Sequence, residues 1–234
     1  MGFVVKNTTR ISILDLIAPF TCRGCGARGA TLCECCKKHN IKACPKICPR
    51  CGKNHKKCSC EVPVYVVGFR EGVLKQIVED YKFQSIRAFG RDLAELIDGV
   101  LPEMSNAVVV PLPTISRHIR ERGFDHTRLI AKHLVRLRNR HEPKSSWRLV
   151  PLLERKNNTV QVGSDRNTRL QQAKEAYELN SRFLKSYPIS PGTTYLLLDD
   201  IWTTGASMES AIKILQKAGA KKVAGVVLLM PRPD

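Results

Sequence analysis

The sequence predicts an α/β protein with a mostly parallel sheet, preceded by a small cysteine-rich module. Three observations support this fold class. Short apolar runs of strand length alternate with amphipathic stretches of helical period, which is typical of parallel sheets. One apolar run, at residues 195–198, leads directly into two aspartates and a turn of small residues. All ten cysteines lie between positions 22 and 60, so we expect residues 1–62 and residues 63–234 to form separate domains.

The cysteines come mainly in closely spaced pairs. Three pairs have two residues between the cysteines, and the fourth has one. Pairs of this kind turn two thiolates toward one tetrahedral centre, and in a cytoplasmic chain zinc is favoured over disulfides. We therefore predict two zinc sites, with the ligands Cys22, Cys25, Cys33 and Cys36 in the first and Cys48, Cys51, Cys58 and Cys60 in the second.

Other ligand sets fit the same region. The pair Cys58-x-Cys60 is tighter than usual, so His55 is an alternative ligand. Cys35 or Cys44 can also replace a neighbouring cysteine. A cross-braced pairing of the two sites is a further alternative, as is a single zinc with the remaining cysteines structural.

The chain has a formal net charge of +18. Two four-cysteine zinc sites lower this to about +14, which still predicts attraction to nucleic acids or phosphorylated substrates. Residues 1–62 contain twelve basic residues against three acidic ones, so this module either contacts nucleic acid or is a zinc-stapled cap with solvated lysines. No apolar run is long enough to span a membrane and the N-terminus has no signal-peptide pattern, so we expect a cytoplasmic protein.

The expected elements follow one another in a regular order. Residues 11–20 form a short apolar segment, expected to be a helix that docks on the body. Apolar runs predict strands at residues 65–69, 107–111, 149–153, 195–198 and 222–230. Apolar side chains at helical spacing predict helices at residues 72–81, 87–101 and 124–140, and a fourth after residue 207 that Gly219 ends. The helix at 124–140 is expected to expose Arg128, Lys132 and Arg136 on one face.

The strongest functional signal is the stretch after the strand at 195–198. Asp199 and Asp200 stand at the carboxyl end of this strand, where ligands bind in open α/β sheets. The small residues 203–207 lead into a helix, so backbone N–H groups and the helix dipole favour a phosphate there. Two adjacent carboxylates beside a phosphate suit ribose hydroxyls or a hydrated Mg²⁺. The alternative is an ordinary strand–turn–helix joint with a chance pair of aspartates.

Two further stretches accompany this motif. The strand at 107–111 runs into Leu112 and Pro113, and Arg120 and Arg122 follow as candidates for bidentate phosphate contacts. Residues 155–177 are polar, lack clear periodicity and are long for a connection. They fit either a lid over a reactive site or a plain surface excursion.

Residues 196–207 resemble the phosphoribosyl-pyrophosphate (PRPP) signature of type I phosphoribosyltransferases. The resemblance implies that Asp199 and Asp200 contact the ribose hydroxyls, with Mg²⁺ bridging them to pyrophosphate. It implies a pyrophosphate loop beside Leu112 and Pro113, with Arg120 and Arg122 neutralising the leaving group. The 5′-phosphate would be held by Thr203, Thr204, Gly205, Ala206 and Ser207. Trp202 departs from the usual aliphatic residue, so it either narrows the pocket or supplies a stacking surface.

As a whole the chain resembles the ComF family of competence proteins. The resemblance is carried by the cysteine pairs, by residues 120–124, by Gln161, Arg166 and Arg169, and by residues 199–207. It implies a role in natural transformation, with single-stranded DNA, a competence helicase and a recombination mediator as partners. Asp125-His126 stands where the family has Asn-Gln, so His126 lies either in the pocket or on an exposed face. The alternative function is an active phosphoribosyltransferase of nucleotide or nucleobase metabolism without a DNA role.

Overall fold

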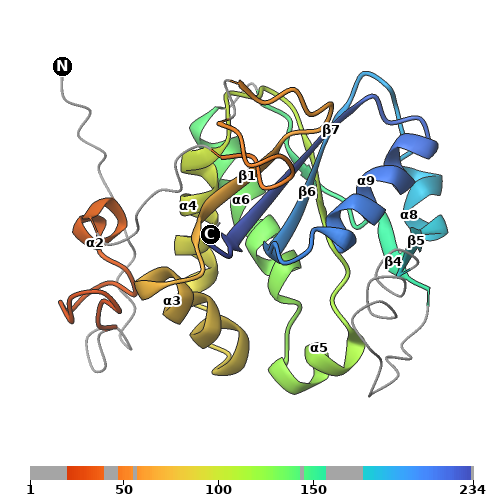
Figure 1. Ribbon diagram of the computed structural model, residues 1–234. Coiled ribbons are helices and arrows are strands. Elements are labelled where there is room, and N and C mark those ends of the chain that lie inside the picture. The colour runs from red at the N-terminus through yellow and green to blue at the C-terminus, as the bar shows by residue number, and fades with distance from the viewer. Residues whose placement is uncertain (1–19, 40–46, 55–56, 143–144, 157–175, 233–234) are drawn as a thin grey trace.

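A parallel sheet of five strands forms the centre of the molecule (Figure 1). The computed structural model describes residues 20–39, 47–54, 57–142, 145–156 and 176–232. Neighbouring strands are parallel throughout this sheet. In their order across the sheet, the strands are β1 (Val64–Phe69), β7 (Lys222–Met230), β6 (Thr194–Ile201), β2 (Val108–Pro111) and β3 (Arg148–Leu149). The predicted α/β class with a mostly parallel sheet is therefore confirmed.

Helices cover both faces of the sheet. One face packs against α3 (Gly72–Phe83), α4 (Phe89–Val100) and α6 (His126–His141), and the other packs against α9 (Ala206–Lys217). The side chains of β6 alternate between these layers. Leu196 and Leu198 join the core beneath α3, α4 and α6, whereas Leu197 joins the core beneath α9. Burial on both faces explains why this strand is an unbroken apolar run in the sequence.

The predicted strand at 149–153 is wrong as a single element. Its first part is the edge strand β3, which pairs with β2. Its end belongs to β4 (Leu153–Arg155), which pairs antiparallel with β5 (Tyr177–Leu179) in a separate two-stranded sheet. Pro151 lies between the two strands, and it has no N–H to continue the ladder. The other predicted strands and helices in the described residues are present and differ only at their ends.

Two short helices have no counterpart among the predicted elements. They are α5 (Ser116–Arg122) and α8 (Ser181–Ser186). Neither helix has a fully buried side chain, and both are too short to show an apolar period in the sequence. The helix α5 follows β2 and ends at Gly123, whose φ of 73° is left-handed. This placement sets the arginines of α5 at the carboxyl edge of the sheet. Within the described residues, no helix is long and apolar enough to cross a membrane.

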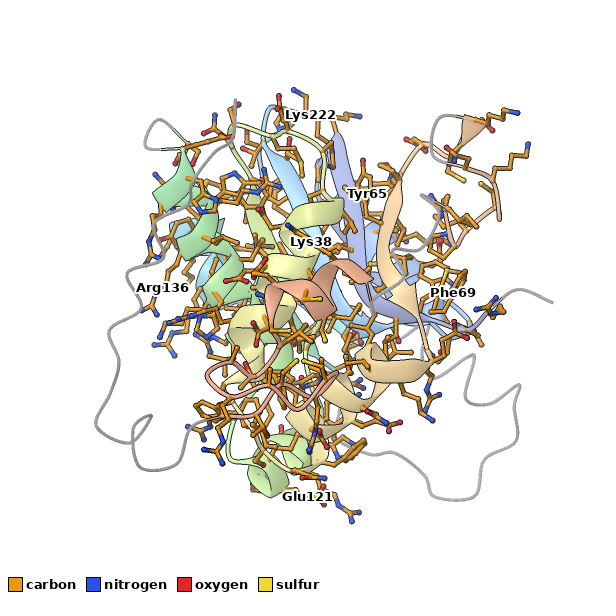
Figure 2. All side chains as sticks on the ribbon, turned by 90° about the vertical axis from the view of Figure 1, so that its left-hand side faces the viewer. Lys38, Tyr65, Phe69, Glu121, Arg136 and Lys222 are labelled. Carbon is orange, nitrogen blue, oxygen red and sulfur yellow. The ribbon has the colours of Figure 1, made fainter. Side chains whose placement is uncertain are left out.

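The cysteine-rich module packs against α3 and α4. Cys22, Leu32 and Cys36 belong to the same buried cluster as the inner side chains of these two helices. The short helix α2 (Glu34–His39) lies over α4, as the position of Lys38 in Figure 2 also shows. Most of the apolar segment predicted at 11–20, together with Cys44 and His55, lies outside the described residues.

Candidate functional site

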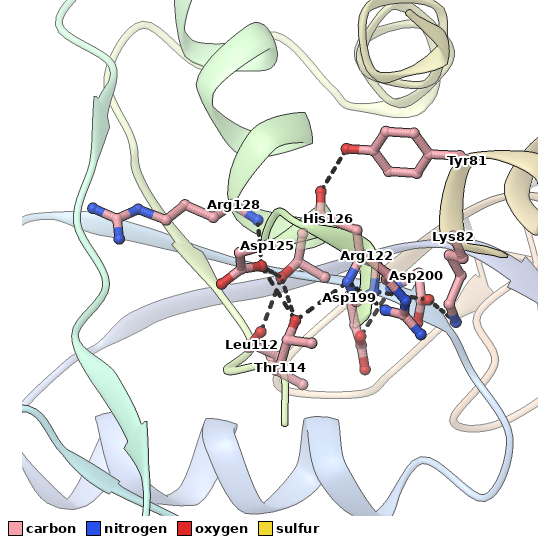
Figure 3. Close-up of polar contacts among 11 residues, drawn as sticks. Tyr81, Lys82, Leu112, Thr114, Arg122, Asp125, His126, Arg128, Asp199 and Asp200 are labelled. Atoms are coloured by element: carbon pink, nitrogen blue, oxygen red, sulfur yellow. Dashed lines mark hydrogen bonds and ion pairs between the residues drawn. The ribbon is translucent and has the colours of Figure 1, made fainter. Parts of the chain in front are cut away.

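Asp200 is the centre of a buried polar cluster at the carboxyl end of β6. Its Oδ2 forms an ion pair with Lys82 Nζ of α3 and accepts a hydrogen bond of 3.0 Å from His126 Nε2 of α6 (Figure 3). Burial raises the pKa of Asp200, but the hydrogen bond from His126 and the charge of Lys82 outweigh it and hold this pKa below its usual value. The Asp200 carboxylate therefore connects β6 with α3 and α6 at the carboxyl edge of the sheet.

The donors around His126 determine its tautomer. Arg122 Nη1 lies 3.0 Å from His126 Nδ1, and a guanidinium can only donate, so Nδ1 is the acceptor. The proton of the neutral ring therefore sits on Nε2, where it is donated to Asp200. Thr114 Oγ1 lies 3.3 Å from the same Nδ1, and Tyr81 donates to the His126 carbonyl at 2.9 Å. Arg122 is connected to Asp200 through this single imidazole.

The site contains two residues that the sequence did not single out clearly. Lys82 lies near the end of α3, and the sequence predicted this helix from its apolar side chains alone. The ion pair of Lys82 with Asp200 depends on how α3 packs against β6. His126 was assigned either to the pocket or to an exposed face, and it is buried in the site. Arg122 reaches the cluster, whereas Arg120 lies exposed on α5.

Asp199 lies on the opposite face of the strand, because successive side chains of β6 alternate. Burial and the charge of Asp200 raise its pKa well above the usual value. Tyr177 of β5 lies on the same side, because it belongs with Leu197 to the buried cluster beneath α9. Burial and the charge of Asp199 raise the pKa of the Tyr177 hydroxyl. The two carboxylates therefore differ: Asp200 is already paired, whereas Asp199 shows the raised pKa of a carboxyl without a strong cationic partner.

The turn between β6 and α9 is tightly built. Gly205 has a left-handed φ of 77°, and a Cβ at this position would collide with the indole ring of Trp202. Trp202 is only 9% exposed, so its ring supports the turn from within rather than offering an open stacking face. Thr203 and Thr204 are exposed, and α9 begins at Ala206. The N-terminal end of a 12-residue helix therefore stands beside the carboxylate pair.

Leu112 and Pro113 adjoin the end of β6. The N–H of Leu112 donates to the Leu198 carbonyl at 2.9 Å, and the Leu112 carbonyl accepts from Thr127 Oγ1 at 3.0 Å. The Pro113 carbonyl accepts from Arg155 Nε at 3.1 Å. A cavity of about 450 Å³ lies next to these residues, and its lining includes Thr114 and Arg128. Most of the predicted lid, including Gln161, Arg166 and Arg169, lies outside the described residues.

Both predicted zinc sites are assembled as four-cysteine clusters. The sulfur atoms of each predicted set lie within 4.8 Å of one another. Cys25 Sγ and Cys33 Sγ are 3.7 Å apart, and Cys51 Sγ and Cys58 Sγ are 3.6 Å apart. Zn–S bonds of about 2.3 Å in a tetrahedron separate the sulfurs by about 3.8 Å, so both clusters fit zinc. The cross-braced pairing is therefore wrong, and Cys35 lies exposed outside the first cluster.

The two clusters begin with equivalent turns, and each turn places an arginine on the body. Gly26 and Gly52 stand four residues after Cys22 and Cys48, and both have a left-handed φ. The N–H of each glycine donates to the carbonyl of the cysteine that begins its turn. Arg23 pairs with Asp80 of α3. Arg50 pairs with Glu209 of α9 through both carboxylate oxygens, at 2.6 and 3.0 Å.

The comparisons with known proteins give distant structural likenesses. Two solved structures described as analyses of an invariant aspartic acid in HPRTs, an asparagine mutant and a glutamic acid mutant, are each 16% identical over 65% of this chain, with TM-scores of 0.36. The matches cover 71% and 73% of those chains. A hypoxanthine phosphoribosyltransferase from Staphylococcus aureus is 14% identical over 65% of this chain and 69% of its own, with a TM-score of 0.32. No family model and no curated protein matches the chain.

Proposed function

We propose that this chain is a ComF-like protein of phosphoribosyltransferase type that binds PRPP with Mg²⁺ and takes part in DNA uptake. The observation that carries the proposal is the carboxylate pair Asp199–Asp200 beside the N-terminus of α9. A carboxylate next to a helix N-terminus suits a ligand with sugar hydroxyls and a phosphate. The 5′-phosphate would lie on the residues 203–207.

The two carboxylates have different roles in this proposal. Asp199 binds the ribose hydroxyls or the hydrated Mg²⁺, and the metal supplies charge neutralisation of the pyrophosphate. Asp200 orients Lys82 and, through His126, Arg122. These two cations then face the negative charge of the pyrophosphate group. Leu112 and Pro113 shape the loop beside it, and Arg120 adds positive potential from the surface of α5.

The exposed face of α6 is the proposed contact for single-stranded DNA. Arg128, Lys132 and Arg136 are exposed at intervals of four residues, and α6 contains no acidic residue. Figure 2 shows Arg136 at the surface of the molecule. Burial and the charges of Arg91, Arg136 and Lys132 lower the pKa of His133. Three phosphates can therefore be neutralised along one helix face.

The zinc module contributes less free charge than its composition suggests. Arg23, Lys37 and Arg50 form ion pairs with carboxylates of the body. We therefore propose that the zinc module has a structural role, in which its two zinc sites hold these arginines and this lysine against the body. The principal contact for DNA is then α6. A competence helicase and a recombination mediator are the proposed protein partners.

Titration calorimetry with PRPP and Mg²⁺ tests the proposal. We expect saturable binding to the full-length protein and at least a tenfold loss in Asp199→Ala. Asp199 is the residue to change, because Asp200 also holds Lys82 and His126 in place. Absence of binding to the wild-type protein would overturn the PRPP assignment. Binding of PRPP without any affinity for single-stranded DNA would instead favour a phosphoribosyltransferase of nucleotide metabolism.

A further inference from the structure

Phe83 is the most exposed large apolar side chain of the described residues, and it stands at the candidate site. It is the last residue of α3, and it is 72% exposed. The preceding residue, Lys82, forms the ion pair with Asp200. A phenylalanine that buries so little of its ring contributes little to folding through burial.

Two cations of the site flank this ring. Lys82 Nζ lies 5.8 Å from the ring centroid, and the Arg122 guanidinium carbon lies 5.6 Å from it. Both cations also belong to the polar cluster, since Lys82 contacts Asp200 and Arg122 contacts His126. Figure 3 shows both cations next to Asp200. The ring therefore lies one side chain away from the carboxylate that organises the site.

The backbone that presents Phe83 is strained and braced. Ser85, two residues later, is the one non-glycine residue with a positive φ in the described part of the chain, at 54°. Its hydroxyl donates to the Arg122 carbonyl at 3.0 Å, and Arg87 Nη2 donates to the Gly123 carbonyl at 2.6 Å. The turn after α3 is thus fastened to the end of α5. A strained turn held in this way is typical of a functional position.

We propose that Phe83 is a stacking platform for a nucleobase whose attached phosphate is held by Lys82 and Arg122. An exposed aromatic ring between two cations matches a ligand with a flat π surface and a nearby negative charge. A free nucleotide and a single-stranded nucleic acid share this chemistry. The proposal deepens the function above, because it places a base next to the PRPP pocket, and it rests on that pocket being a phosphate site.

Binding of single strands with and without bases tests the platform. The probes are a fluorescent strand of about ten deoxythymidines and an abasic strand of the same length, which has the same phosphates. We expect the wild-type protein to prefer the base-containing strand, and Phe83→Ala to weaken its binding about 5- to 150-fold, the range of one lost stacking contact. The slope of log affinity against log salt should stay unchanged, because no charge is removed. Phe83→Trp should retain the preference.

Tyr187→Ala is the matched control, because Tyr187 is an exposed aromatic residue, 42% exposed, that lines a cavity at the amino edge of the sheet. Equal effects of Phe83→Ala on both strands, or an equal effect of Tyr187→Ala, would overturn the proposal. Titration with thymidine monophosphate distinguishes a free nucleotide from a single-stranded nucleic acid as the ligand. If Phe83→Ala loses binding of the monophosphate, the site binds nucleotides. If only binding of the strand is lost, the site binds nucleic acid. PRPP titration of the wild-type protein tests the proposed function separately, because a preference for the base-containing strand that Phe83→Ala abolishes would stand even if PRPP did not bind.

Discussion

Asp199 and Asp200 are neighbours in sequence with opposite effects on stability. The pKa of Asp200 is below the usual 3.8 in the folded protein, so its interactions stabilise the fold above that pH and are lost as the pH falls through the lowered value. The pKa of Asp199 is above 3.8, so its contribution is complete below that pH and is lost as the pH rises through the raised value. At pH 7 an ionised Asp199 therefore costs stability.

This difference predicts opposite outcomes for two isosteric variants. Asp199→Asn should raise the free energy of unfolding by about 1 kcal/mol at pH 7, and this gain should shrink toward pH 4. Asp200→Asn should lower it by about 3 kcal/mol, because it leaves Lys82 buried without its counter-charge. Urea unfolding at both pH values measures the two effects. A loss of stability in Asp199→Asn at pH 7 would contradict the assigned roles.

His126 is predicted to act through both ring nitrogens. His126→Ala should cost about 1–3 kcal/mol of unfolding free energy, because Asp200 and Arg122 each lose a buried hydrogen bond. His126→Gln should lie within about 1 kcal/mol of the wild type, because its amide can donate to one partner and accept from the other. Urea unfolding compares the variants, and ¹⁵N spectra of the labelled imidazole test the tautomer. An Nδ1-protonated ring would contradict the hydrogen-bond assignment.

At the scale of elements, Gly205 should tolerate no side chain. Gly205→Ala is expected to cost about 3 kcal/mol or more, of which about 1–2 kcal/mol comes from the left-handed backbone and the rest from collision with Trp202. Gly219→Ala is the control, since Gly219 also has a positive φ, 100°, and a Cβ there has nothing within 4 Å. Equal unfolding free energies for the two variants would show that Trp202 imposes no restriction.

The predictability of each element follows how much of it is buried. The strand β6 and the turn to α9 were predicted because burial on both faces and the φ of Gly205 demand particular residues. The helix α5 was missed because it buries no side chain, and the strand at 149–153 was misjudged because Pro151 divides two different sheets. The contacts of Lys82 depend on how α3 packs against β6, and no local pattern reports that packing.

The second zinc turn should position α9 through the pair Arg50–Glu209. Removing zinc with a chelator is expected to increase hydrogen exchange at the first turn of α9, because the loop that holds Arg50 loses its metal. Arg50→Met should reproduce this increase while the zinc content stays at about two per chain. Lys53→Met is the control, since Lys53 is exposed on the same turn. Unchanged exchange in Arg50→Met would show that the pair does not position the helix.

At the scale of the whole molecule, the charge distribution predicts where a polyanion binds. The ion pairs of Arg23, Lys37 and Arg50 use charges of the module to attach it to the body. The face of α6 has exposed cations, and its buried Arg138 is paired with Asp98. Net charge alone does not distinguish these two surfaces, because both are rich in lysine and arginine. The two surfaces differ in the folded chain, because three cations of the module form ion pairs with carboxylates whereas Arg128, Lys132 and Arg136 of α6 are exposed.

Two variants with the same change in net charge test this distinction. Replacing Arg128, Lys132 and Arg136 by alanine should weaken binding of single-stranded DNA and make the slope of log affinity against log salt shallower by about 2, since each lost phosphate contact contributes about 0.7. The matched variant replaces three exposed cations of the module, Arg28, Lys53 and Lys57, by alanine. It should leave the slope nearly unchanged. A larger effect of the module variant would move the DNA contact from α6 to the zinc module, because each variant has lost three positive charges.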